Sequence, residues 1–456
     1  MTKNISIFYI TLFSIFIISI SPCFSNTIDN EILSYQNKNR ISNIEWEQVV
    51  DQGFGNNNNL HAWAMKEYKG FIYAGTRNVV DGCQIYRSET GDNNTWIKVN
   101  LDGFDTDNKS EGARHMIVYA NLLWVITISW EFGAQVWVTN GEDSDSDGIL
   151  NWKKANTNGF GQGNVTIETR GLAIFNDKLY VGSGSKDNHP LLYRYDGPTE
   201  FNTIDPTKWT LVKDWYEDPN YSSNLFLVGD LYNFTSFDGK NYLYVSIITG
   251  VTPLHRDLID NFSIINLLKT LKIMLFEKGQ IWRYDSINWE LVGKEVFKTT
   301  NQMVSTFVAL NKSLYVGTAN WFGGEIWKTE DGINWKQVIK RGFYSPFNFW
   351  IWKLFNYNNR IIAGTLNPVL GCEIWASKND FPMRQRDFIK IGRHGMDGAN
   401  IFTTGELPQD GARSFEIFNG TLYVGTTNWV DLNSNLKGTG CEIWRIKNDE
   451  KYQYNN

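Results

Sequence analysis

Short stretches of alternating apolar and polar residues occupy most of the chain. The clearest one, SLYVGTANWFGGEIWKTEDGINWKQV, spans residues 313–338. Such alternation predicts strands with one buried side, and Asn419-Gly420 between two stretches is a strong signal for a tight hairpin. The pattern therefore predicts an all-β chain of short antiparallel strands.

These stretches recur at intervals of roughly fifty to sixty residues, a period typical of propellers and solenoids. Each copy divides into four short strands, here A to D, which predicts a closed all-β array. The last copy stops at Ile446 without strand D, whereas EWEQV at residues 45–49 resembles that strand and precedes the first copy. We therefore predict a seven-bladed β-propeller over residues 44–447. Its N-terminal strand completes the last blade and closes the ring, which removes exposed sheet edges.

Residues 1–25 have the layout of a secretory signal peptide. Lys3 precedes an apolar run from Ile5 to Ile20, and Ser25 is a suitable last residue before cleavage. The run is short for a membrane span, which needs about 20 apolar residues. We predict a secreted chain, extracellular or periplasmic, with no transmembrane span after cleavage. An uncleaved anchor is the alternative.

The remaining segments outside the repeat are short. Residues 26–43 are predicted to be a linker and 448–456 a tail. An insertion at residues 251–278 contains an amphipathic helix, with Leu267, Leu271 and Leu275 on one side. This helix either packs on the propeller surface or serves as a lid, a partner-docking helix or an interfacial membrane helix.

Charge and cysteine usage narrow the possible partners. The net charge of −6 argues against nucleic acid, which calls for a basic stripe. Cys83, Cys372 and Cys441 occupy one repeat position in different copies. Equivalent positions in different blades lie too far apart for a disulfide, so we expect three small buried thiols.

The segment KTEDGINW, residues 328–335, resembles the Asp-box (BNR) repeat, with weaker versions at 90–96 and 284–289. The resemblance implies a β-propeller in which the Asp accepts hydrogen bonds within a turn and the Trp packs between strands. Proteins with this repeat include sialidases, other glycosidases, photosystem assembly propellers and exported proteins, so the resemblance implies a fold rather than a function. The Phe/Tyr-Arg-Ile-Pro motif of sialidases is absent from the sequence, which argues against sialidase activity.

Three tryptophans fall outside the strand positions of the repeat. Trp130, Trp321 and Trp429 occupy the same place in the loop between strands B and C of different copies. They are expected on one face, where exposed aromatic rings stack on sugars or anchor proteins. The alternative is that they pack over neighbouring loops.

A second set of residues lies twelve positions before the strand B glycine and is expected at the mouth of the central channel. Arginines there would clamp a carboxylate or phosphate through paired N–H donors, with Glu111, Glu168 and Asp410 close by in sequence. The alternative is that they bond to acids and carbonyls of adjacent blades. The set comprises Trp63, Arg114, Arg170, Phe234, Ser305, Trp352 and Arg413.

One hairpin on the opposite face resembles a calcium loop. Asp143, Asp145 and Asp147 stand at alternate positions before a glycine, with the Ile149 carbonyl and the Asn151 side chain as further oxygen donors. We predict a structural calcium ion that fixes a long hairpin. A solvated acidic hairpin is the alternative.

Three functions remain open at this point. The first is a binding propeller that recognises a glycan or a protein on the B–C loop face. The second is a glycoside hydrolase or lyase acting at the channel mouth, where two suitably spaced carboxylates would favour hydrolysis. The third is a structural surface scaffold. His61 and His115 are expected near the mouth, but a histidine without a fixed partner does not identify a catalyst.

Overall fold

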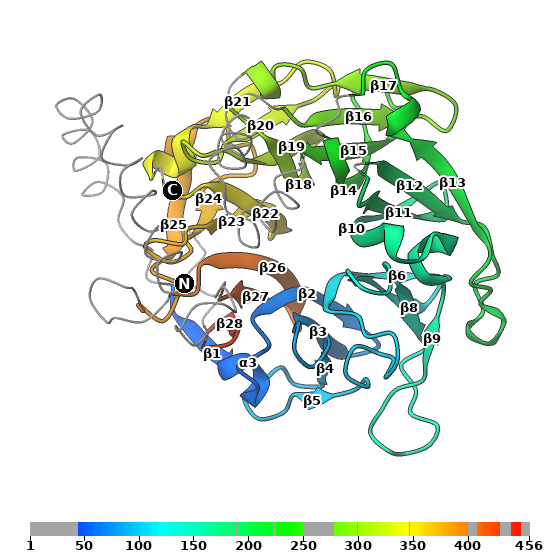
Figure 1. Ribbon diagram of the computed structural model, residues 1–456. Helices are drawn as coiled ribbons and strands as arrows, with labels where there is room; N and C mark the ends of the chain where they lie inside the picture. The colour runs from blue at the N-terminus through cyan, green and yellow to red at the C-terminus, as the bar shows by residue number, and fades with distance from the viewer. Residues whose placement is uncertain are drawn as a thin grey trace, which may run out of the picture.

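The computed structural model describes residues 44–187, 189–221, 225–249, 278–298, 300–345, 347–399, 408–428 and 439–447. These residues form an all-β propeller of antiparallel strands arranged in a circle (Figure 1). The predicted signal peptide, the linker, the tail, Trp429 and nearly all of the 251–278 insertion lie outside the described residues. Within the described part, no helix has the length and apolar character needed to cross a bilayer.

Consecutive strands pair in sets of four, with the first strand of each set nearest the centre (Figure 1). The first sets are β2 (His61–Tyr68), β3 (Phe71–Arg77), β4 (Ile85–Ser88) and β5 (Ile97–Lys98); β6 (Gly112–Tyr119), β7 (Leu122–Ile128), β8 (Val136–Thr139) and β9 (Trp152–Lys154); β10 (Thr166–Phe175), β11 (Lys178–Ser185), β12 (Pro190–Tyr195) and β13 (Trp209–Asp214). The next are β14 (Leu225–Thr235), β15 (Asn241–Thr249), β16 (Gln280–Tyr284) and β17 (Trp289–Val292); β18 (Met303–Leu310), β19 (Ser313–Ala319), β20 (Ile326–Thr329) and β21 (Lys336–Ile339); β22 (Trp350–Tyr357), β23 (Arg360–Leu366), β24 (Ile374–Ser377) and β25 (Phe388–Gly392).

The final set joins the two ends of the described chain. It contains β26 (Gly411–Phe418), β27 (Thr421–Thr427), β28 (Ile443–Ile446) and β1 (Trp46–Val50). β1 pairs antiparallel with β28, with Trp46 opposite Ile446 (Figure 1). Glu47 and Arg445 form an ion pair of 2.8 Å across this pairing, and the indole of Trp46 donates to the Ile391 carbonyl at 2.7 Å.

Among the described residues, helical segments are limited to short turns between strands. α3 (Gln52–Gly55) contains two residues with left-handed backbone angles and is a turn rather than a regular helix. The 3₁₀ turns are η2 (Asn158–Gly161), η3 (Gly163–Val165), η4 (Phe201–Thr203), η5 (Trp215–Glu217), η6 (Val296–Lys298), η7 (Arg341–Tyr344) and η8 (Gln385–Asp387).

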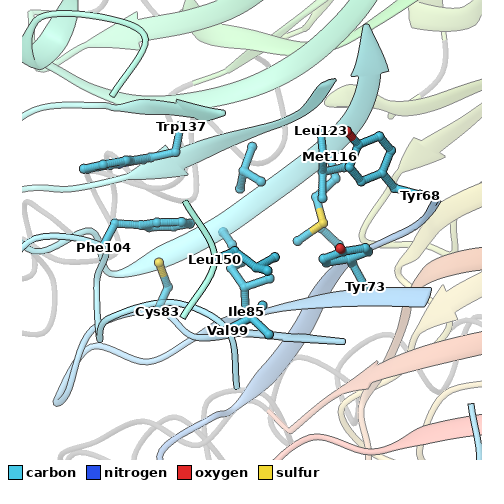
Figure 2. Close-up of a cluster of buried hydrophobic side chains, with 13 residues drawn as sticks. Tyr68, Tyr73, Cys83, Ile85, Val99, Phe104, Met116, Leu123, Trp137 and Leu150 are labelled. Atoms are coloured by element: carbon cyan, nitrogen blue, oxygen red, sulfur yellow. The ribbon is translucent and has the colours of Figure 1, made fainter. Parts of the chain in front are cut away.

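A repeated Gly-Phe pair joins neighbouring strand sets. Phe104 follows β5 and stacks on Trp137 of the next set, with ring centroids 5.0 Å apart (Figure 2). Its backbone is left-handed, with φ of 68°, a conformation that costs a non-glycine residue roughly 1 kcal/mol. Burial of two large aromatic faces offsets this cost. The same stack recurs as Phe54 on Tyr86, Phe160 on Tyr193 and Phe343 on Trp375.

A buried polar network also repeats between the sets. Asn301 donates to Glu325 at 2.7 Å and accepts from Thr318 and Asn320, and the indole of Trp327 donates to the same Glu325 carboxylate. Buried polar groups that are mutually satisfied in this way fix a single packing arrangement. Equivalent networks are centred on Asn59 and Asn348.

The turn between β20 and β21 has the geometry expected of an Asp box. The carboxylate of Asp331 accepts from the backbone of Ile333 and of Asn334, at 2.8 and 2.7 Å. Although burial acts to raise its pKa, hydrogen bonds from Asn334, Ile333 and Thr329 lower the pKa of Asp331 to about 2. Trp335 is buried below the turn. Asp331 and Trp335 therefore stabilise the turn and have a structural role.

The three cysteines at one repeat position are buried free thiols in separate strand sets. Cys83 packs in the apolar cluster that contains the Phe104–Trp137 stack (Figure 2). Cys372 and Cys441 lie in two other clusters. The repeat position of these three cysteines therefore requires a small side chain, because it is fully buried.

Glu442, a buried carboxylate that accepts from the indole of Trp444, is predicted to make the stability of the fold depend on pH. Burial, reinforced by the Asp397 carboxylate, raises its pKa from the usual 4.5 to about 8. The folded state therefore binds the proton more tightly than the unfolded state, and its stability falls as pH rises from about 4.5 to 8, by an amount on the order of 3–5 kcal/mol. Gln84 and Gln135 occupy the equivalent place in other sets and accept the same aromatic hydrogen bond.

We expect Glu442→Gln to raise the thermal unfolding temperature at pH 8.5 and to have little effect near pH 4.5, because glutamine keeps the acceptor for Trp444 without a charge. Thermal denaturation followed by circular dichroism across this range measures the difference. A gap between variant and wild type that does not change with pH would contradict the prediction.

Candidate functional site

Each innermost strand carries a β-bulge near its first residues. The pairing of β6 with β7, for example, shifts between Ala113 and His115, which leaves Arg114 as the extra residue. A bulge kinks the strand and redirects the side chain of that extra residue. The bulge positions are Trp63, Arg114, Arg170, Gly229, Ser305, Trp352 and Arg413.

This set matches the predicted channel-mouth set at every position except one. Phe234 was predicted for the fourth copy, but the bulge of β14 lies between Val228 and Asp230 and contains Gly229. Phe234 lies five residues further along β14 and is buried in an apolar cluster. The prediction was wrong because the β14–β15 hairpin is longer than the others, so that counting a fixed twelve residues back stops short of the bulge.

Two tryptophans hold two of the arginines in stacked positions. The guanidinium of Arg114 lies 4.2 Å from the ring centroid of Trp63, which also faces Arg77 at 5.5 Å. Arg413 lies 5.4 Å from the ring of Trp352 in the same way. In each case the Trp comes from one innermost strand and the Arg from the next. Such cation–π contacts contribute about 0.5–2 kcal/mol and restrict the guanidinium plane.

Glycines make room for both tryptophans. A Cβ added at Gly112 would lie 2.4 Å from the Trp63 ring, and one at Gly411 would lie 2.3 Å from the Trp352 ring. Each glycine stands two residues before the stacked arginine, within the sequences Glu-Gly-Ala-Arg and Asp-Gly-Ala-Arg. The motif therefore couples a Trp on one strand to an Arg on its neighbour.

The third arginine, Arg170, meets the other two at the centre. Arg413 interacts electrostatically with Arg170, Glu168 and Asp230, although β26 lies across the circle from β10 and β14 (Figure 1). Lys353 of β22 approaches Asp230 from a further strand. We call these residues the central cluster: Arg114, Glu168, Arg170, Asp230, Lys353 and Arg413.

The two carboxylates of the central cluster are engaged unequally. Glu168 forms an ion pair of 3.4 Å with Arg114. Asp230 accepts from the backbone of Leu231 at 3.0 Å and of Phe307 at 3.1 Å. Burial raises the pKa of Asp230, although Lys353 and these hydrogen bonds act against the shift.

The centre has a positive potential that disfavours further protonation. Burial lowers the pKa of Arg114 and of Arg413, and in both cases the neighbouring Arg170 guanidinium lowers it further. Burial, then Lys353 and Arg413, lowers the pKa of His115; burial, then Arg77 and Arg114, does the same for His61. The histidines are therefore neutral at ordinary pH.

The predicted loop tryptophans are half-buried rather than fully exposed. Trp130 packs against an apolar cluster that includes Ile167, Phe226 and Met303. Trp321 packs against Phe349 with ring centroids 5.4 Å apart. Both therefore belong in part to the alternative interpretation, in which they cover neighbouring loops. Trp429 lies outside the described residues.

Two of the three acids predicted near the arginines have other partners. Glu111 accepts from the backbone of Trp130 at 3.3 Å, and Asp410 accepts from the Thr427 hydroxyl at 2.6 Å. Of the three predicted acids, the structure brings only Glu168 into the central cluster. Sequence reasoning missed Asp230 and Lys353, each of which stands one residue after a bulge position. Comparing the copies of the repeat one residue further along, at the position after the bulge, would have found Lys353.

The predicted calcium hairpin is an exposed turn between β8 and β9. Asp143 accepts from the Gly148 backbone and Asp147 from the Ile149 backbone, while Asn151 donates to Ser144. Asp145 is exposed. In the described part of the chain, no three His, Cys, Asp or Glu side chains gather closely enough to hold a metal ion. Calcium binding at this hairpin remains a prediction.

Comparison with known proteins gives similarity in structure only. No protein-family model matches the sequence, and no curated protein matches it significantly. Polysaccharide lyase Uly1 is 10% identical, with 85% of this chain and 89% of that chain covered and a TM-score of 0.46. The SapL1 lectin in complex with alpha methyl fucoside is 10% identical, covering 74% and 96%, with a TM-score of 0.43. A Trypanosoma rangeli sialidase in complex with sialic acid is 11% identical, covering 86% and 60%, with a TM-score of 0.42. At these TM-scores the similarities carry no information on ligand or reaction.

The Trp–Gly–Arg coupling predicts a specific stability effect. We expect Gly112→Ala to lower the free energy of unfolding by about 1–3 kcal/mol, because the new methyl group displaces the Trp63 ring. In a Trp63→Leu background the same change should cost much less, since the ring is gone. Urea denaturation of the four proteins in this cycle measures the coupling. An equal cost in both backgrounds would contradict it.

Proposed function

We propose that this protein is a secreted seven-bladed β-propeller, closed by its N-terminal strand, that binds a glycan on the B–C loop face. The observation that carries the proposal is the central cluster, in which two arginines stacked on tryptophans converge with a third. The bulges lie near the first residues of the innermost strands, which pair with the last residues of the second strands, where the B–C loops begin. The cluster therefore belongs to that face.

The chemistry around the cluster suits sugars. Half-buried Trp130 and Trp321 present part of an aromatic face, and aromatic faces pair with the C–H faces of sugar rings. The arginines supply fixed donors for hydroxyl or acidic oxygens.

We expect the mature chain, residues 26–456, to bind a subset of glycans on an array, and the double variant Trp130→Ala/Trp321→Ala to bind them at least tenfold more weakly. Phe237→Ala is the matched control. Phe237 is 78% exposed in the turn between β14 and β15, on the opposite face, so its loss should leave binding unchanged.

Circular dichroism establishes that each variant is folded before binding is compared. Equal losses in the control and the double variant would contradict a site on this face. If the wild-type chain binds no glycan on the array, the proposal is wrong, and a protein partner or a structural scaffold is favoured.

A hydrolase or lyase is the second candidate, and one observation favours it. Asp230 has a raised pKa and shares the neighbourhood of Arg170 with Glu168, which places a candidate proton donor near a second carboxylate. Incubating array-positive glycans with the wild type and with Asp230→Asn distinguishes the candidates. Release of new reducing ends or unsaturated products by the wild type alone indicates catalysis, whereas unchanged glycans indicate a binding protein.

A further inference from the structure

The central cluster has more positive than negative charge and leaves buried donors unused. Four cationic side chains face two carboxylates: Arg114, Arg170, Lys353 and Arg413 against Glu168 and Asp230. Burying an excess of like charge is costly unless a counter-charge is supplied. Within the described residues the carboxylates offset only part of this charge. Glu168 pairs with Arg114, Asp230 is held by backbone N–H groups, and Glu416, which also acts on Lys353, is paired with Lys66.

The unused donors identify what is missing. The Nε and Nη2 atoms of Arg170, and the Nε atoms of Arg114 and Arg413, are buried without a hydrogen-bond partner. An unsatisfied buried donor costs about 1–3 kcal/mol, and more when it is charged. The three guanidinium groups come from β6, β10 and β26, and Arg170 lies close enough to the other two to lower the pKa of both. A group with several acceptor oxygens and negative charge would satisfy them together.

We propose that the centre of the propeller is an oxyanion site, in which Arg114, Arg170 and Arg413 hold the acidic group of a glycan. This inference rests on the proposed glycan-binding function and makes it specific: the ligand carries a carboxylate or a sulfate ester. The arginines are positioned before the ligand arrives, because the Trp63 and Trp352 rings fix two of the three. Such preorganisation lowers the entropy cost of binding.

The first experiment measures stabilisation by small oxyanions. Thermal unfolding of the mature chain is followed in sodium glucuronate, in sodium sulfate, and in glucose with sodium chloride at matched ionic strength. A ligand that binds only the folded state raises the unfolding temperature in proportion to the logarithm of its concentration above Kd. We expect such a rise with glucuronate or sulfate and none with glucose. The oxyanion with the lower half-saturation identifies the group that the site prefers.

The variants separate a binding role from a structural one. Arg170→Gln and Arg413→Met should each weaken the oxyanion effect about 10- to 100-fold, the loss expected for charge-assisted hydrogen bonds. Without oxyanion they should unfold at a higher temperature than the wild type, because they remove repulsion between buried cations. Arginines that only hold the blades together would give the opposite result, a lower unfolding temperature.

Lys66→Gln is the matched control. Lys66 also lies on an innermost strand, but its ammonium group is paired with Glu416 at 2.9 Å. We expect this variant to unfold at a lower temperature and to keep the oxyanion effect. If either arginine variant fails to fold, Arg170→Lys keeps the charge with a single donor point and should retain the fold with a weaker effect. A full oxyanion response in Arg170→Lys, or none in the wild type, overturns the proposal.

Acidic oligosaccharides and their neutral counterparts distinguish this inference from the proposed function. Oligouronates are compared with their methyl esters, and sulfated oligosaccharides with the desulfated forms. Binding of acidic forms alone supports both proposals. Binding of neutral forms with equal affinity overturns the oxyanion site and leaves glycan binding intact. Stabilisation by sulfate or glucuronate without binding of any oligosaccharide supports the oxyanion site and overturns the glycan function.

Discussion

An extra residue in every innermost strand is the constraint on which the centre of this propeller depends. A regular strand directs alternate side chains to its two faces, where neighbouring strand sets pack. The bulge breaks that alternation once, so that one residue escapes the packing rule and faces the centre. Without the bulge, Arg114 and Arg413 would be forced into the apolar layers between sets. The stacking with Trp63 and Trp352 follows from the same shift, because both members of each pair stand at bulge positions.

Stability is therefore supplied away from the centre. The Phe–aromatic stacks and the Asn-centred networks lie at the boundaries between strand sets, where Phe343 and Trp375 are buried against each other and the side chains of Asn301 and Asn348 have hydrogen-bond partners. The centre has the opposite character, with unpaired donors and excess charge. A fold that is well packed at the boundaries between its strand sets tolerates local instability at its axis.

The sequence predicted the features that follow from local pattern. Alternation, the repeat period and the Asn-Gly turns indicated a propeller, and EWEQV has the pattern of the strand that pairs with β28. The bulge residues were found at all positions except the β14 one, where an elongated hairpin breaks the register. Features that depend on contacts between distant segments were not predictable. The partial burial of Trp130 and the arrival of Asp230 beside Arg413 arise from strands that lie far apart in sequence.

Comparison of the copies within this one chain separates structural positions from chemical ones. The strand C position holds an aromatic ring in most sets, Tyr86, Trp137 and Trp375 among them, because a Phe of the preceding set must stack on it. The bulge position, in contrast, holds Trp, Arg, Gly or Ser in different strands, although the backbone there is the same. A position whose geometry repeats but whose chemistry varies is not fixed by packing. The arginines on β6, β10 and β26 are therefore not required by the packing of the strand sets, and each of them interacts with charged groups of the central cluster.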